Sequence, residues 1–280
     1  SDYATILPIE PGPDTTAAEP WEQDELPDTT DIDPTMLSRV ALVAEDDVLN
    51  VRQDPGVTAP IVGMLVPGVV VERTGQDEIV GSSRWVQVDT PVGGFWVNDR
   101  FLAAVVTPVE FEADARVSEL LAEFGEIIAT DGDLRQVTSR RGLYVSHHAA
   151  PIRFAPEELG TILTDTTTYQ WPSNAISSDD AEFDQIPGRT FTAAVADSFL
   201  SAYDDPDTVT TVNEPIVGGN GRPPAYAIPF EFQSFNYIGV YDPGDNPDYG
   251  GLDWIIWYVS IDYENGSPVI IGLTVDMWAP

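Results

Sequence analysis

Short runs of β-forming residues alternate with turn residues in the first part of the chain, from residue 41 to residue 104. The pairs Pro55-Gly56 and Pro67-Gly68 separate the first of these runs. Runs of this length at a spacing of about 8–12 residues predict a small all-β barrel or sandwich. The five expected strands are Val48–Arg52, Ile61–Leu65, Val69–Val71, Trp85–Val88 and Gly94–Val97.

The apolar pattern changes after residue 105. Residues three and four apart predict a helix over 113–129, and Pro156 is placed to begin a short one. A third helix is marked by Phe191, Val195, Phe199 and Tyr203. The expected strands are 142–146, 209–212, 227–241, 254–263 and 269–278. Asn265-Gly266 predicts a type I′ hairpin between the last two. Helices followed by antiparallel strands predict an α+β domain with its helices packed on an antiparallel sheet. A curved sheet around a helix, as in cystatin-like or cone-shaped pocket folds, is the expected form.

The N-terminal segment lacks this patterning. Residues 1–38 contain ten acids, six prolines and no base. Proline disfavours helix and sheet, and like charges extend a chain, so these residues predict a disordered acidic tether. The expected organisation is therefore a tether at 1–38, a β-barrel at 41–105 and an α+β domain at 106–280. An acidic interaction tail is the alternative for the tether, with Trp21 and Leu26 as candidates for docking onto a domain.

Charge and cysteine content exclude several classes of function. The chain has 47 acidic and 12 basic residues, all the bases are arginine, and the formal net charge is −35. Such a surface repels nucleic acid, so no nucleic-acid partner is expected. The absence of cysteine excludes disulfides, thiolate metal sites and a cysteine nucleophile. No apolar run reaches the ~18 residues of a membrane helix, so we expect membrane contact only through a removed N-terminal anchor.

Several runs in the first part of the chain carry a resemblance. These are LNVRQDPG (49–56), IVGMLVPG (61–68), VVVE (69–72), WVQV (85–88) and GFWVNDRFL (94–102). Their order resembles the bacterial SH3-type (SH3b) domain over residues 42–104. The resemblance implies an SH3-like barrel, and members of the family often bind peptidoglycan or other cell-wall polymers. This chain departs from the pattern in a longer, more acidic loop at 75–83 and in the pair Phe95-Trp96.

The second part of the chain resembles uncharacterised secreted or lipid-anchored bacterial proteins. The segments that carry this resemblance are RRGLYVSHHAAPIRFAPEEL (140–159) and WYVSIDYENGSPVIIGLTVDMW (257–278). The resemblance implies an extracytoplasmic location, periplasmic or at the cell surface, but no activity.

Candidate binding residues are aromatic or polar. Trp85, Trp96 and Trp257 have rings on which a sugar can stack, although such rings also fill cores. Asn98 follows in the Phe-Trp-Val-Asn run, and Arg222 is one of few cations that can receive a carboxylate. These five residues form the predicted binding set.

The loop after residue 241 is the candidate metal site. Asp242, Asp245 and Asp248 supply the hard oxygen ligands that calcium prefers, and no other cofactor is expected. A solvated hairpin loop without metal is the alternative.

Catalytic patterns are weak. His147 and His148 are adjacent and would face opposite sides of a strand, and Ser146 lacks a G-x-S-x-G elbow. Glu231, in an apolar strand, is the best single carboxylate for a glycosidase.

The function that these observations favour is non-enzymatic. We expect an extracytoplasmic envelope protein that binds a cell-wall polymer such as peptidoglycan, a small ligand or an envelope protein. The first alternative is a carboxylate-dependent hydrolase acting on an envelope or extracellular glycan. The second is a purely structural role, in which the two folded parts pack together through an apolar interface.

Overall fold

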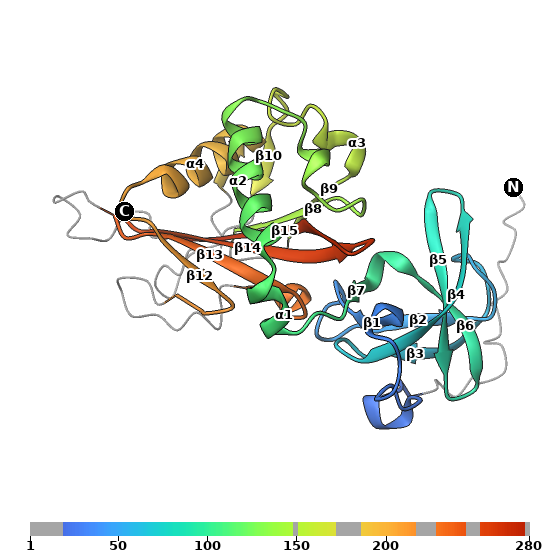
Figure 1. Cartoon of the computed structure of the whole chain (residues 1–280). Helices are drawn as coiled ribbons and strands as arrows, with labels where there is room; N and C mark the ends of the chain where they lie inside the picture. Colours follow the sequence, from blue (N-terminus) through green and yellow to red (C-terminus); the bar gives the residue numbers. More distant parts are fainter. Residues whose placement is uncertain (1–18, 148–150, 172–185, 217–227, 245–252, 278–280) are drawn as a thin grey trace, which may run out of the picture.

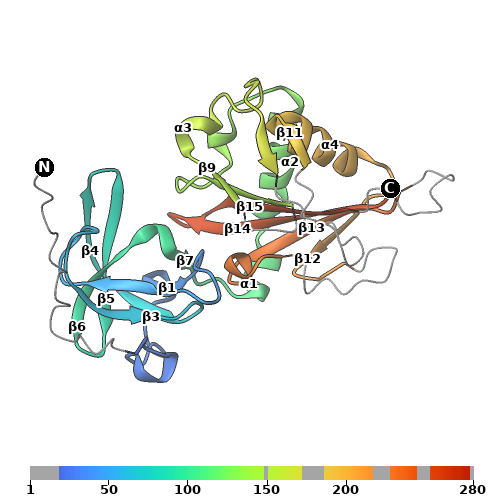
Figure 2. The same cartoon turned by 180° about the vertical axis from the view of Figure 1, so that it is seen from behind.

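The computed structural model describes residues 19–147, 151–171, 186–216, 228–244 and 253–277. They form a mixed α+β fold that is mostly β-sheet. The seven strands up to residue 104 make an N-terminal β unit, and the elements from residue 108 onward make a C-terminal α+β unit. The two units lie side by side and touch where the chain crosses between them (Figures 1 and 2).

One sheet of seven strands, in the order β3-β2-β6-β5-β4-β1-β7, forms the N-terminal β unit. Its strands are β1 (Leu37–Val40), β2 (Leu49–Arg52), β3 (Ile61–Leu65), β4 (Val70–Val80), β5 (Ser83–Thr90), β6 (Gly93–Asn98) and β7 (Leu102–Ala104). Three 3-10 turns accompany them: η1 (Gln23–Glu25), η2 (Pro34–Met36) and η3 (Asp99–Phe101). All five predicted strands are confirmed as β2 to β6. Alternate residues of β2, β5 and β6 fill the core, because side chains of a strand point to opposite faces in turn.

The predicted acidic loop at 75–83 is instead a β-hairpin. Strands β4 and β5 continue through it as an antiparallel pair, with Val80 opposite Ser83 and Gly81 in the turn at φ +63°. Residues 74–82 are exposed, and the Val80 side chain lies near Gly56 in the loop between β2 and β3. The two-residue turn Gly81-Ser82 connects the two strands and keeps them paired to the end of the hairpin.

Part of the expected tether packs on the N-terminal β unit. The Trp21 N–H donates to the Met64 carbonyl at 2.8 Å, and Leu26 is buried. The indole of Trp21 lies so close over Gly63 that a Cβ there would stand 2.2 Å from the ring. Docking of Trp21 and Leu26 is therefore the arrangement observed, and the described residues 19–38 are ordered rather than part of a disordered tether. Burial of these two apolar side chains outweighs the repulsion among the acids around them.

The C-terminal α+β unit is built on a six-stranded sheet in the order β12-β13-β14-β15-β8-β9. Its strands are β8 (Leu143–His147), β9 (Ile152–Phe154), β12 (Val209–Val212), β13 (Asn236–Asp242), β14 (Ile255–Glu264) and β15 (Ser267–Met277). A separate pair is formed by β10 (Tyr169–Trp171) and β11 (Ile186–Arg189). Asn265 and Gly266 have φ of 52° and 77°, so the predicted type I′ hairpin is confirmed.

The helices of this unit cover one face of the sheet. They are α1 (Pro108–Ala113), α2 (Ala115–Ala129), α3 (Pro156–Leu159) and α4 (Asp197–Asp204), with the 3-10 turn η4 (Leu134–Gln136) and the π-helical turn η5 (Thr192–Ala196). Phe124 of α2, Phe199 of α4 and Trp257 of β14 lie in the core beneath them. The 3-10 turn η7 (Phe230–Phe232) lies on the other face. Helices packed on one face of a largely antiparallel sheet confirm the α+β prediction, although β15 and β8 pair in parallel. Among the described residues, no helix is long and apolar enough to cross a membrane.

The strand predicted at 227–241 is shorter than expected. It begins at Asn236, and Phe230–Phe232 forms η7 instead. The rings of Phe232 and Phe235 are buried against the face of the sheet that the helices leave open. Glu231 therefore lies in a 3-10 turn rather than in a strand, because the two phenylalanines gain more by packing across the sheet than by extending it.

The two units share an apolar cluster on that second face of the sheet. Ala41, Leu42 and Ala103 of the N-terminal β unit contact the C-terminal α+β unit there. The residues they meet are Tyr144, Phe232, Phe235 and Ile271. The two folded parts thus share an apolar contact, and the structural alternative, which requires a large apolar interface, stays a prediction.

Candidate functional site

Strands β2 and β6 of the N-terminal β unit place polar side chains on its outer face, beside an indole of β5. In β2, Leu49 and Val51 are buried in the core, whereas Asn50 and Arg52 alternate with them and point outward. In the β5–β6 pair, Trp85 lies directly opposite Asn98. The strand pattern thus places a row of polar groups beside an indole.

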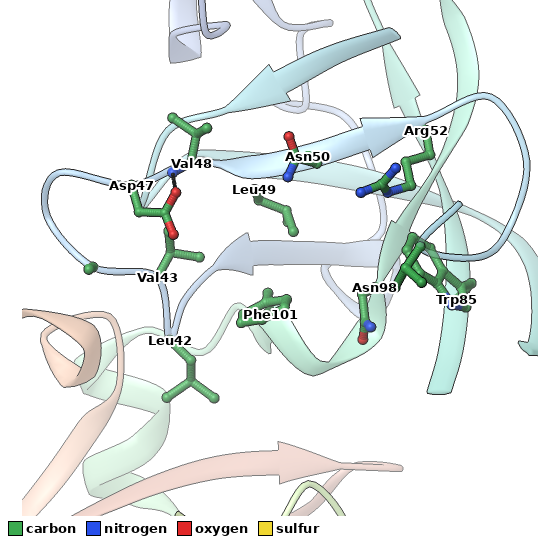
Figure 3. A pocket seen from close by; sticks show the side chains of 12 residues that line it. Leu42, Val43, Asp47, Val48, Leu49, Asn50, Arg52, Trp85, Asn98 and Phe101 are labelled. Atoms are coloured by element: carbon green, nitrogen blue, oxygen red, sulfur yellow. Dashed lines mark hydrogen bonds between the residues drawn. The ribbon is translucent and has the colours of Figure 1, made fainter. Parts of the chain in front are cut away.

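A groove of about 240 Å³ opens at this row (Figure 3). Leu49, Phe101 and Leu42 form its apolar middle, and Trp85 and Asn98 lie together at one end. The complete lining is Leu42, Val43, Ala44, Asp47, Val48, Leu49, Asn50, Arg52, Val57, Trp85, Asn98 and Phe101. This volume is smaller than the ~300–1,000 Å³ of drug-sized sites, so the groove accommodates a fragment or the end of a chain.

The ends of the groove carry opposite charges. Asp47 lies at one end, where its Oδ1 accepts a hydrogen bond from the Val48 N–H at 2.8 Å. Arg52 lies at the other end beside Trp85 and Asn98 (Figure 3), and its Nη1 donates to the Ala59 carbonyl at 2.6 Å. Among the described residues, no carboxylate lies within ion-pair distance of Arg52.

The turn η3 connects this groove to the second unit. Asn98 caps it, accepting the Arg100 N–H at 3.0 Å, and the Phe101 side chain lines the groove. Asp99, 4% exposed, bonds Arg73 at 2.9 Å and Arg140 of the C-terminal α+β unit at 2.7 Å. The guanidinium of Arg100 donates to the Tyr144 hydroxyl at 2.8 Å. Within this turn, Asn98 and Phe101 line the groove, whereas Asp99 and Arg100 bond the C-terminal α+β unit.

A buried ion pair lies at the centre of that interface. Arg141 donates to Asp262 and, at 2.6 Å, to the Leu102 carbonyl, while the second oxygen of Asp262 accepts the Ala104 N–H at 2.9 Å. Burial raises the pKa of Asp262, and Arg141 opposes that rise. Because both carboxyl oxygens accept from donors, the geometry is that of the ionised carboxylate. Both partners belong to the C-terminal α+β unit, and their hydrogen bonds to the Leu102 carbonyl and the Ala104 N–H join this pair to strand β7 of the N-terminal β unit.

Leu42 occupies an unusual backbone conformation where the groove meets the interface. Its φ is 57°, a left-handed value that is uncommon for a residue other than glycine. The Leu42 N–H donates to the Glu231 carbonyl at 3.2 Å, and its side chain lies both in the groove lining and in the shared apolar cluster. Strain of this kind costs about 1–3 kcal/mol and persists only where surrounding contacts enforce it.

The structure separates the predicted binding residues. Trp85 and Asn98 come together in the groove, and Trp96 pairs with Arg52 across β2 and β6 but does not line it. Trp257 is fully buried beneath α4, near His147 and Phe199, so no face of its ring is open to a ligand. Arg222 lies outside the described residues.

The candidate metal and catalytic residues do not form a site in the described part of the chain. There, no group of three or more His, Cys, Asp or Glu side chains is arranged to hold a metal ion. Asp242 accepts the Gly244 N–H at 2.9 Å, as in an ordinary turn, and Asp245 and Asp248 lie outside the described residues. His147 is buried against Trp171, whereas His148 is not described.

The sequence analysis missed the residues that give the groove its charge and its floor. Asn50 and Arg52 occupy the polar positions of an alternating strand, a signal that equally describes an ordinary solvated face. Asp47 resembles any loop acid. Leu42 and Phe101 come from different segments, and only the tertiary fold brings them together. Comparison of the chain with protein-family models, with curated proteins and with solved structures finds no match.

Proposed function

We propose that this protein is a non-enzymatic binding protein of the bacterial cell envelope, and that its N-terminal β unit is an SH3-type barrel whose groove holds the ligand. The motif order from LNVRQDPG to GFWVNDRFL supports the barrel assignment. The observation that carries the binding role is the groove itself, where Trp85, Asn98 and Asn50 surround an apolar floor.

The proposed ligand is a cell-wall polymer such as peptidoglycan, held outside the cytoplasm. Its peptide and sugar groups present amides and hydroxyls, which the side chains of Asn50 and Asn98 can bond. Apolar groups of the polymer would contact Leu49 and Phe101. The acidic N-terminal segment supports this location, because such segments commonly separate an anchor from a folded domain.

Co-sedimentation of the full chain with purified peptidoglycan sacculi tests the proposal. Val57 lines the groove and is 69% exposed, so Val57→Asp changes the groove without disturbing the core. Val92 is 62% exposed and does not line the groove, so Val92→Asp is the matched control. We expect retention of the wild type and of Val92→Asp, and about tenfold weaker retention of Val57→Asp.

Two results would contradict the proposal. Absence of wild-type retention would exclude peptidoglycan as the ligand. Equal retention of the two valine variants and the wild type would remove the groove from the binding role.

A further inference from the structure

The groove has the charge arrangement of a receptor for a short chain with charged ends. Asp47 and Arg52 lie at opposite ends of it (Figure 3). They are five residues apart along a largely extended segment, which at about 3.3 Å per residue sets their Cα atoms roughly 16 Å apart. An extended peptide of three or four residues spans about 10–14 Å.

The arginine at one end of the groove has no described carboxylate beside it. Six other arginines of the described residues form ion pairs with carboxylates: Arg73, Arg84, Arg116, Arg135, Arg140 and Arg141. Arg52 has no such partner among the described residues, and it is the one arginine of the groove lining. The same lack of an ion pair holds for Arg39, Arg100, Arg153 and Arg189, which lie outside the groove. One of its N–H groups is bonded to Ala59, which fixes the guanidinium and leaves its remaining donors for a ligand.

Neutral donors surround this guanidinium. The Asn98 oxygen is used by the Arg100 N–H, which fixes the amide and directs its NH₂ group away from the turn. The Trp85 side chain, 3% exposed, lies in the same wall of the groove. A guanidinium beside amide and indole donors suits a carboxylate, because charge-assisted hydrogen bonds are shorter and stronger than neutral ones.

We infer that the groove captures the carboxylate end of a short peptide, with the carboxylate at Arg52, an apolar side chain on Leu49 and Phe101, and the amino end at Asp47. This inference rests on the proposed function, because it names the part of the ligand that the groove holds. The small volume supports an end of a chain over its middle. The opposite charges fix the direction in which the peptide lies.

Binding of the tripeptide alanyl-leucyl-alanine to the full chain tests the inference, measured by calorimetry and by chemical-shift changes of groove residues. Its C-terminal amide removes the carboxylate, and its N-acetyl form removes the ammonium group, without any change in the protein. We expect the amide to bind at least about tenfold more weakly than the free acid, equivalent to ~1.4 kcal/mol. The acetylated peptide should bind about threefold more weakly, since Asp47 is exposed and therefore screened.

A protein variant completes the cycle. Arg52→Gln should reduce binding of the free acid to the level of the amide and leave binding of the amide unchanged. Arg84→Gln, which changes an arginine on the hairpin outside the groove, should leave both unchanged. Equal binding of acid and amide by the wild type, or no binding of either, would overturn the inference. If the protein still co-sedimented with sacculi and Val57→Asp weakened this retention, the proposed function would stand without the peptide inference. If the protein bound the free acid selectively but did not co-sediment with sacculi, the inference would be supported and peptidoglycan would be rejected as the ligand.

Discussion

The arginines of the interface and the arginine of the groove are held in opposite ways. Arg141 is 6% exposed and bonds Asp262, which is 5% exposed, within the C-terminal α+β unit, and both also bond the backbone of the N-terminal β unit. Arg52 lies at the open end of a groove and bonds only a carbonyl among the described residues. The first arginine is neutralised inside the fold, whereas the second is the one that a ligand carboxylate would meet under the proposal above.

Both sites depend on the same short turn. Asn98 and Phe101 face the groove, while Asp99 and Arg100 bond the C-terminal α+β unit. A ligand that displaced Phe101 would therefore also disturb the contacts between the units. Three ion pairs of decreasing burial allow the contribution of charge to the free energy of unfolding to be compared.

The largest effect is expected at the buried pair of the interface. Asp262→Asn retains the shape of the side chain but leaves the guanidinium of Arg141 uncompensated inside the protein. Removing one partner of a buried pair destabilises a protein by about 3–5 kcal/mol. Urea denaturation of the full chain measures this loss in the free energy of unfolding. A loss below about 1 kcal/mol would show that water reaches the pair.

An intermediate effect is expected at the start of α2. Asp114, 14% exposed, caps this helix, and hydrogen bonds from Arg116 lower its pKa to about 2. A carboxyl with a depressed pKa in the folded state stabilises the protein above its unfolded pKa of 3.8, and this contribution disappears as the pH falls toward 2. We expect a loss of about 1 kcal/mol between pH 4 and pH 2, because Arg116 is largely exposed and the pair is partly screened.

The variant Asp114→Asn isolates this charge, since asparagine also caps helices well. Denaturation at a series of pH values should show a shallower loss of stability for the variant than for the wild type between pH 4 and pH 2. Parallel curves for the two proteins would assign the acid sensitivity to other carboxyls.

The smallest effect is expected on the hairpin. Arg84 and Asp77 are 38% and 45% exposed and lie 3.1 Å apart. Exposed pairs of this kind contribute about 0–1 kcal/mol. Arg84→Gln should therefore change the free energy of unfolding by less than about 0.5 kcal/mol in the same urea measurement. A larger change would mean that this exposed pair contributes more to stability than surface ion pairs ordinarily do.

Local pattern predicted much of the fold. The strand at 209–212 has the boundaries that alternation predicted, and the Asn265-Gly266 turn formed where its backbone preference required. The helix predicted at 113–129 is α2, which begins two residues later. These elements are determined by residues close to one another in sequence, so a short stretch of the chain is enough to predict each of them.

Long-range packing decided the rest. Phe230 and Phe232 are compatible with a strand, yet the buried ring of Phe232 sits over Gly272 and the segment turns. Arg141 and Asp262 are 121 residues apart, and nothing in either segment marks the other as its partner. Trp85 and Asn98 could be identified as candidates from their motifs, but the Arg52 charge could not be distinguished from an ordinary strand residue.

The sequence by itself determined the element types, the division into a β-rich first part and an α+β second part, and two residues of the groove. It did so because period, turn chemistry and charge composition are local or summed properties of the chain. Only the tertiary structure decided that Leu42 and Phe101 meet, that Arg52 has no carboxylate partner among the described residues, and that Arg141 reaches Asp262. Those facts depend on the distance between side chains far apart in sequence, which is set by how the strands and turns of each unit pack.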